Sequence, residues 1–399
     1  MNSPLRIREL RVHRLRIPMR LRFEHAAAVR DAADPIVVTL AAAAPYAHEM
    51  GYGETLARSY VTGETADSAS DDLNNIFGTC LGEFEPASFV EALEFIERLP
   101  FVSDGREITA ARCAIELALL DLTCKVFGRQ PADIAGWMGL VGFGPPGCRG
   151  SARYGGIVVG RTRRKIHTML RLQRLYGLRD FKLKVAVDGW QQRLAWASEV
   201  LGGALARGKV TLRVDANAGW TLAEAVEHVE LLEQHGVCAL EQPLPDVSDP
   251  DLPYLAERTS CHLIADESLR LFEDAQRLIT AGGVRVFNIR LAKNGGLMPS
   301  LRIARLALAE GLDVQLGCMV GETSILTAAG QAFLEACPHV RFVEGAFGRF
   351  LLKQDVTRRP IRFGYGGRVR HRAMDGFGVD VDAGALEDLT VERRRATMV

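Results

Sequence analysis

The chain has 399 residues, 48% of them hydrophobic, and its 49 Lys and Arg residues balance 49 Asp and Glu, so the net charge at neutral pH is zero. This balance excludes a general attraction to nucleic acid or to an anionic membrane, and no basic segment interleaved with aromatic residues predicts a nucleic-acid module. The length allows two domains, or one barrel with an addition.

Cysteine usage and the N-terminus indicate the compartment. The eight cysteines have no CxxC spacing, and several lie in apolar runs such as ARCAIELALL, which is typical of reduced, buried thiols. The segment MNSPLRIRELRVHRLRIPMR has no uninterrupted apolar core, so it predicts neither a signal peptide nor a membrane span. We expect a cytoplasmic protein without membrane partners, whose first strand lies at an edge or surface.

Mixed signals in residues 1–130 predict the N-terminal part of an α+β capping domain. Strands are predicted at RELRVHRLRI and PIVVTLA, followed by the glycine-punctuated stretch GYGETLARSYVTGET and the helical pattern SFVEALEFIERL. Residues 109–127 predict a long helix that Gly128 ends as a C-cap. Between the first strands, RFEHAAAVRDAADP predicts a mobile loop over the mouth of the next domain, where Arg30 either binds a distal anionic group of the substrate or stays solvated.

Regular alternation begins at about residue 150. Eight strand-like runs are separated by seven amphipathic segments: RYGGIVV, FKLKV, TLRVDAN, CALEQP, HLIADES, VFNIRLAK, DVQLGCM and VRFVEGAF. This count favours a (β/α)7–8 TIM-like barrel over residues 150–350, rather than an open sheet. Residues 351–399 lack the alternation and are expected to return to the cap.

Lysine occupies every other position of FKLKV. In an ordinary half-buried strand Lys182 and Lys184 would lie in solvent, but alternate residues of a closed barrel strand point inward. We therefore expect both lysines inside the barrel, where burial and mutual repulsion would lower their pKa values toward those of a useful base.

Charged residues recur at the predicted carboxyl ends of neighbouring strands, where barrel enzymes carry their chemistry. Steps of about 25 to 31 residues, one βα unit each, separate Lys184, Asp215, Glu241, Asp266 and Lys293. Three adjacent carboxylates favour a hard divalent cation, Mg²⁺ with Mn²⁺ as the alternative. The structural alternatives are a turn residue for Asp215, a cap for Glu241 and an arginine partner for Asp266.

Two lysines on opposite faces of one carbon permit proton removal on one side and delivery on the other, while the cation stabilises the enediolate oxygens. The sequence therefore predicts abstraction of a proton α to the carboxylate of a small molecule.

These motifs resemble the enolase superfamily and, within it, the muconate lactonizing enzyme subgroup. The matching segments are KLK at 182–184, DAN at 215–217, EQP at 241–243, DES at 266–268, the lysine of RLAKNGG at 293, GYGET at 51–55, YVTGET at 60–65, AIELALLDLTCKVFG and DGFG at 375–378. The resemblance covers nearly the whole chain. The seventh strand, VQLGCMVG, has no histidine, which argues against the subgroups that use a histidine base.

The resemblance implies a role for each matching position. Asp215, Glu241 and Asp266 would bind the metal, and Lys184 and Lys293 would form the acid/base pair. Lys182 would tune Lys184 and contact the substrate carboxylate, and Asn217 would lie near the metal.

The subgroup's reactions are cycloisomerisation of muconates, dehydration to o-succinylbenzoate, racemisation of N-acylamino acids and epimerisation of dipeptides. Dipeptide epimerases carry Asp-x-Asp at the eighth strand, where this chain has Glu344 and Ala346. Glu344 would meet a cation, or would face solvent or an arginine. Glu322, near the mouth, has no assigned role.

We predict a Mg²⁺-dependent racemase, epimerase or cycloisomerase. The alternatives are a lyase of the o-succinylbenzoate synthase type and a binding barrel without catalysis. Barrels of this type commonly self-associate, so a homo-oligomer is expected.

Overall fold

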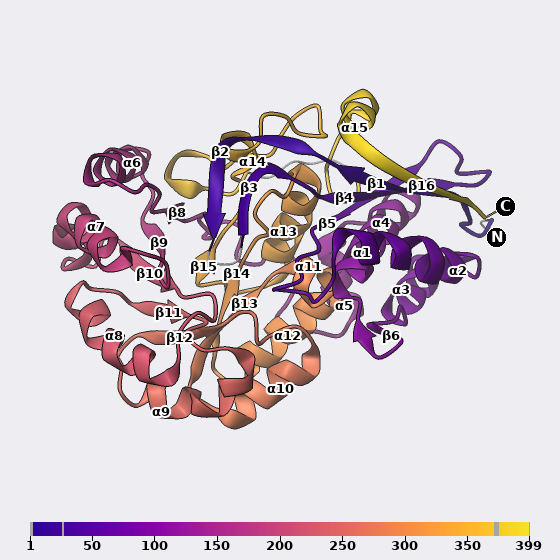
Figure 1. Ribbon diagram of the computed structural model, residues 1–399. Coiled ribbons are helices and arrows are strands. Elements are labelled where there is room, and N and C mark those ends of the chain that lie inside the picture. The colour runs from indigo at the N-terminus through magenta and orange to yellow at the C-terminus, as the bar shows by residue number, and fades with distance from the viewer. Residues whose placement is uncertain (1–2, 26–27, 371–374, 399) are drawn as a thin grey trace.

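The computed structural model describes residues 3–25, 28–370 and 375–398, with backbone only for 21–25 and 28–30. A barrel and a capping sheet lie side by side, and both chain ends lie at the cap (Figure 1). No helix in these ranges is long and apolar enough to cross a membrane. All eight cysteines are free thiols.

Parallel strands form the barrel, and each was predicted as a strand-like run. Their order in the described part of the chain is sequential: β8 (Gly156–Ile157), β9 (Asp180–Lys184), β10 (Thr211–Asp215), β11 (Ala239–Glu241), β12 (His262–Ala265), β13 (Val284–Ile289), β14 (Asp313–Leu316) and β15 (Phe342–Val343). A parallel bridge between Tyr154 and Val343 joins the two end strands. The predicted TIM-like barrel is confirmed.

Helices cover the outside of the barrel. They are α6 (Arg163–Leu175), α7 (Trp190–Leu205), α8 (Leu222–Gln234), α9 (Leu252–Ala256), α10 (Phe272–Ala281), α12 (Leu297–Ala309) and α13 (Ser324–Ala336). Two short helices, α11 (Leu291–Asn294) and α14 (Gly348–Leu351), instead follow the carboxyl ends of β13 and β15. Phe181 and Leu183 are fully buried, whereas the alternate positions Lys182 and Lys184 contact the acidic residues of the neighbouring strands. The predicted inward direction of both lysines is therefore confirmed.

The cap is a four-stranded sheet covered by helices. Its strand order is β16 (Thr390–Thr397), β1 (Ile7–Leu15), β4 (Ile36–Ala42) and β5 (Met50–Thr55). The helices are α1 (Ala66–Asp72), α2 (Gly78–Leu81), α3 (Phe89–Glu97), α4 (Thr109–Phe127), α5 (Ile134–Trp137) and α15 (Ala383–Leu389), and β6 (Val102–Ser103) pairs with β7 (Arg106–Glu107). Gly128 ends α4 in the left-handed conformation, as predicted.

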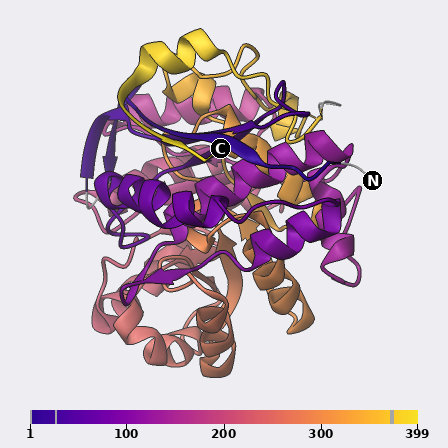
Figure 2. The same cartoon turned by 90° about the vertical axis from the view of Figure 1, so that its right-hand side faces the viewer.

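The edge position expected for the first strand is wrong. β1 lies between β4 and β16, and Val12 pairs with Arg394 from the other end of the chain. Figure 2, seen from the cap side, shows the yellow C-terminal strand beside the indigo N-terminal strand. Arg8 is exposed and Arg11 and Arg14 are half-buried, whereas the other residues of β1 are buried, as suits an internal strand.

The loop predicted around Arg30 is also wrong. β2 (Ile17–His25) and β3 (Ala28–Ala33) form an antiparallel hairpin in which Phe23 pairs with Arg30. A bridge between Met19 and Leu352 places the hairpin beside α14, past the end of β15 (Figure 1). The side chain of Arg30 lies outside the described residues, so its expected contact with substrate stays a prediction.

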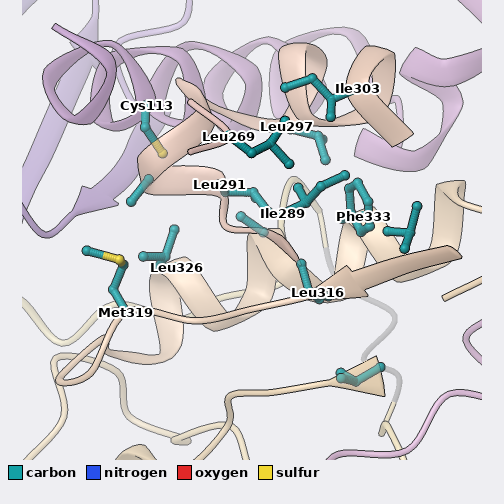
Figure 3. Packing of buried hydrophobic residues seen from close by; sticks show 14 of the residues in the cluster. Cys113, Leu269, Ile289, Leu291, Leu297, Ile303, Leu316, Met319, Leu326 and Phe333 are labelled. Atoms are coloured by element: carbon teal, nitrogen blue, oxygen red, sulfur yellow. The ribbon is translucent and has the colours of Figure 1, made fainter. Parts of the chain in front are cut away.

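Helix α4 joins the cap to the barrel. Cys113 of α4 lies in the same apolar layer as Leu269, Leu291 and Leu297 of the barrel (Figure 3). Glu116 accepts hydrogen bonds from the backbone N–H groups of Leu297 (2.6 Å) and Met298 (3.0 Å), so it caps the N-terminus of α12.

Candidate active site

Three carboxylates meet at the carboxyl ends of adjacent strands. Asp215 ends β10 and pairs in register with Glu241, which ends β11, and Asp266 directly follows β12. All three are at most 1% exposed. The parallel sheet therefore brings together the residues that the sequence spaced by one βα unit each.

Lys182 lies among these carboxylates. Its Nζ is 2.8 Å from Glu241 Oε1, 3.2 Å from Asp215 Oδ2 and 2.8 Å from Glu344 Oε1. Burial disfavours the ammonium form, but the three carboxylates outweigh burial and raise the pKa of Lys182 above its ordinary value. The prediction of a lowered pKa is therefore wrong for Lys182.

Lys184 has the opposite electrostatic character. Burial, with a further contribution from the neighbouring charge of Lys182, lowers its pKa, and Asp215, 3.6 Å away, offsets this only in part. Its Nζ donates a 2.6 Å hydrogen bond to Asn217 Oδ1. The lowered pKa predicted for this lysine is confirmed.

Asn217 connects Lys184 to the carboxylates. Its backbone N–H donates to Asp215 Oδ1 (3.0 Å), and its Nδ2 donates to Glu267 Oε1 (3.2 Å). Its φ of +46° lies in the left-handed region, which asparagine tolerates better than most residues.

Lys293 is on α11, the short helix after β13, rather than on the strand itself. Its Nζ donates to Asp266 Oδ1 (2.8 Å) and to the carbonyl oxygens of Asp266 (2.6 Å) and Asn288 (2.9 Å). The side chain is fully buried. Burial, and then the charge of Arg290, lower the pKa of Lys293 well below its ordinary value.

Sequence analysis missed a layer of polar residues beneath the carboxylates. Asn288 Nδ2 donates to Glu241 Oε1 (3.0 Å), and Gln315 Nε2 donates to Glu241 Oε2 (2.9 Å). Arg213 binds Gln315 Oε1 (2.7 Å) and Asp180 Oδ2 (3.0 Å). The sequence did hold a signal, since Arg213, Asn288 and Gln315 each stand between two apolar residues in the strands TLRVD, VRVFNI and DVQL.

Glu344 follows β15 and meets two cations. Besides Lys182, it lies 3.0 Å from Arg213 Nη1. Burial opposes ionisation, but Lys182 and Arg213 prevail and lower the pKa of Glu344 to about 2. Of the alternatives for this residue, the structure selects a half-buried carboxylate paired with cations.

The donor set consists of oxygen atoms, which suit a hard divalent cation. Asp266 Oδ2 is buried and accepts no hydrogen bond from the described residues, although Arg290 lies against it. No three His, Cys, Asp or Glu side chains in the described ranges lie close enough together to hold a metal ion in this arrangement, in which Lys182 and Arg290 contact the carboxylates. The oxygen donors nevertheless fit Mg²⁺ in chemistry.

Comparison with known proteins gives consistent matches. A family model described as Enolase C-terminal domain-like matches residues 166–385. The L-Lys-D/L-Arg epimerase of Methylococcus capsulatus is 30% identical over 83% of this chain and 87% of its own length. Muconate cycloisomerase 1 of Pseudomonas putida is 28% identical over 64% of this chain and 65% of its own.

A solved structure shares the fold over nearly the whole chain. The dipeptide epimerase from Cytophaga hutchinsonii, complexed with Mg and the dipeptide D-Ala-L-Val, superposes with a TM-score of 0.80 at 20% identity. The superposition covers 98% of this chain and 99% of that one.

Proposed function

This chain belongs to the enolase superfamily as an isomerase-type enzyme related to muconate cycloisomerases and dipeptide epimerases, and from that premise we propose that it moves a proton at the carbon α to a substrate carboxylate with the help of Mg²⁺. The substrate is a small-molecule carboxylate. The product is a racemised, epimerised or cycloisomerised acid.

The observation that carries this proposal is the placement of two lysines beside the three carboxylates, and burial lowers the pKa of each lysine. Lys184 lies beside Asp215 and Lys293 beside Asp266, so the strands that hold the carboxylates separate the two amines. A neutral amine at one side removes the α-proton, and the ammonium at the other side delivers a proton to the opposite face. Lys182 stays charged and attracts the substrate carboxylate.

We assign Asp215, Glu241 and Asp266 as the ligands of Mg²⁺, with Mn²⁺ as the alternative. When bound, the cation supplies positive charge against the negative charge that builds on the substrate carboxylate as the α-proton leaves. Asn288 and Gln315 hold both oxygens of Glu241 in place. The Mg-bound dipeptide epimerase of the same fold supports this assignment.

The eighth strand bears on the choice of reaction. Glu344 is neutralised by Lys182 and Arg213, and Ala346 leaves the next alternate position without a carboxylate. An ammonium subsite of the Asp-x-Asp type is therefore absent at these two positions. Racemisation of an N-acylated amino acid, epimerisation with a differently placed subsite, and cycloisomerisation all remain within the proposal.

Three broader expectations stay proposals. The division into residues 1–130, 150–350 and 351–399 is supported by the separate cap and barrel sheets. A cytoplasmic location is supported by the eight free thiols. Self-association is proposed because barrels of this type commonly form homo-oligomers.

The test is proton exchange in D₂O. The Mg²⁺-loaded protein is incubated with dipeptides, N-acylamino acids and muconate-type acids, and deuterium at the α-carbon is followed by NMR. Lys184→Ala and Lys293→Ala should each abolish turnover while Mg²⁺ binding persists. Normal turnover in either variant would overturn the two-lysine mechanism, and product analysis separates isomerisation from elimination of water.

A further inference from the structure

A cavity lies beside the lysines and carboxylates, at the carboxyl ends of β13, β14 and β15. Its lining includes Tyr154, Arg290, Leu316, Cys318, Glu322 and Glu344. Glu344 also contacts Lys182, and Arg290 also contacts Asp266. A substrate whose carboxylate lies at Lys182 therefore has this cavity, with its polar lining, directly beside it.

The charged groups in the lining differ in whether a group of opposite charge pairs with them. Arg290 is paired with Asp266, and Glu344 is paired with Lys182 and Arg213. Glu322, only 9% exposed, forms no ion pair with any described residue of the chain. Its carboxyl is thus the acidic group of the cavity that no described cation of the protein pairs with.

Hydrogen bonds hold the carboxyl of Glu322 in place. The backbone N–H of Met319 donates to Oε2 (3.2 Å), and Thr327 Oγ1 donates to Oε1 (3.1 Å). Each carboxylate oxygen accepts more than one hydrogen bond, so both retain capacity toward the cavity. Burial, followed by the nearby carboxyl of Glu54, raises the pKa of Glu322 to about 8, as expected for an acid that lacks a cation.

The backbone opposite Glu322 is built for close approach. Gly345 has φ +118°, and a Cβ added there would lie 3.0 Å from Glu322 Oε1. Glycine therefore gives the carboxyl its room on the side of the eighth strand.

We propose that Glu322 binds an ammonium group on the arm of the substrate remote from the reacting carbon, so that the enzyme selects amino-acid derivatives with a free amine over dicarboxylates. The positive charge of a bound ammonium would favour the ionised form of Glu322, whereas a second carboxylate on the substrate would find no described cation beside Glu322. This inference rests on the proposed carboxylate chemistry at Lys182. The ammonium is either the N-terminal amine of a dipeptide or the side-chain amine of an N-acylated basic amino acid.

The experiment measures binding rather than turnover. L-alanyl-α-aminoisobutyrate has no α-proton at its C-terminal residue, so the Mg²⁺-loaded protein binds it without reacting. Propionyl-α-aminoisobutyrate is the matched ligand without the amine. Nα-acetyl-α-methyl-lysine and N-acetyl-α-methyl-norleucine, which also lack an α-proton, form a second matched pair, for a side-chain amine. Calorimetry gives the affinities for wild type, Glu322→Gln and the control Glu310→Gln, which removes an exposed carboxylate on the outside of the barrel.

We expect one amine-bearing ligand to bind about 10-fold or more tightly than its matched partner, and the pair that shows this identifies the source of the ammonium. Glu322→Gln should abolish the preference and leave the affinity for the amine-free ligand within about twofold, and Glu310→Gln should behave as wild type. The absence of a preference in both pairs, or a preference that survives in Glu322→Gln, overturns the proposal. Binding of these ligands needs no proton transfer. A failure of α-proton exchange would therefore overturn the proposed function, but it would not change the affinities that test the role of Glu322.

Discussion

Lys184 Nζ and Asn217 Oδ1 are 2.6 Å apart, which makes Asn217 the hydrogen-bond acceptor that orients the proposed base. The same asparagine is held by Asp215 and Glu267, so the amine is positioned from the side of the carboxylates. A base that must meet one substrate proton depends on such positioning.

Asn217→Gly should lower kcat by roughly 10- to 100-fold with little change in KM, because the amine loses its acceptor while the substrate carboxylate is still held by other groups. Glycine keeps the positive φ, so the backbone is not strained. The control is Ala218→Gly, also at positive φ, which removes only a methyl group. Equal kinetics in the two variants would contradict the positioning role.

Removal of any one proposed metal ligand should abolish Mg²⁺ binding. Asp215→Asn, Glu241→Gln and Asp266→Asn are each expected to weaken the affinity by about 100-fold or more, as measured by calorimetry. A chelator should remove the activity of the wild type, and added Mg²⁺ should restore it. Asp313→Asn, at the amino-terminal end of β14, is the matched control and should bind Mg²⁺ normally.

The free energy of unfolding should depend on pH through Glu54, which caps α13. Thr323 and the N–H of Leu326 donate hydrogen bonds to its carboxyl. Burial nevertheless raises its pKa from 4.5 to about 7. The folded state therefore binds the proton more tightly than the unfolded state, so this contribution to stability is present below about pH 4.5 and is lost as the pH rises to about 7.

Between pH 5 and pH 8, wild type should lose roughly 2 to 3 kcal/mol more stability than Glu54→Gln, which cannot titrate. Urea unfolding at several pH values measures the difference. Parallel curves for the two proteins would show that Glu54 is ionised throughout this range.

The GYGET stretch should be intolerant of side chains for a packing reason. A Cβ at Gly53 would lie 1.9 Å from the carbonyl oxygen of Ala114, because β5 crosses directly against α4. Gly53→Ala should destabilise the protein by about 3 kcal/mol in chemical denaturation. Gly202→Ala, in helix α7 with no atom within 4 Å of the added Cβ, should instead stabilise it by about 0.5 to 1 kcal/mol. If the two substitutions changed the free energy of unfolding equally, β5 and α4 would have to move apart at little cost.

Alternation and spacing were sufficient to predict the barrel and the placement of its lysines. Strands in a closed parallel barrel alternate inward and outward, so the order Lys182, Leu183, Lys184 already indicated which side chains face inward. The spacing from Asp215 to Glu241 to Asp266 indicated neighbouring strands for the same reason. The local pattern was insufficient for β1, because its partner β16 comes from the opposite chain end.

The sequence by itself determined the barrel, the helix that ends at Gly128 and the set of acidic and basic residues at the strand ends, since these follow from short-range periodicity. The tertiary structure alone decided the charge of each group. Lys182 and Lys184 stand two residues apart in one strand, yet three carboxylates raise the pKa of the first, while burial lowers that of the second. The pKa of a group depends on the charges and the apolar surface within a few ångströms of it. The order of residues along the chain does not specify those neighbours.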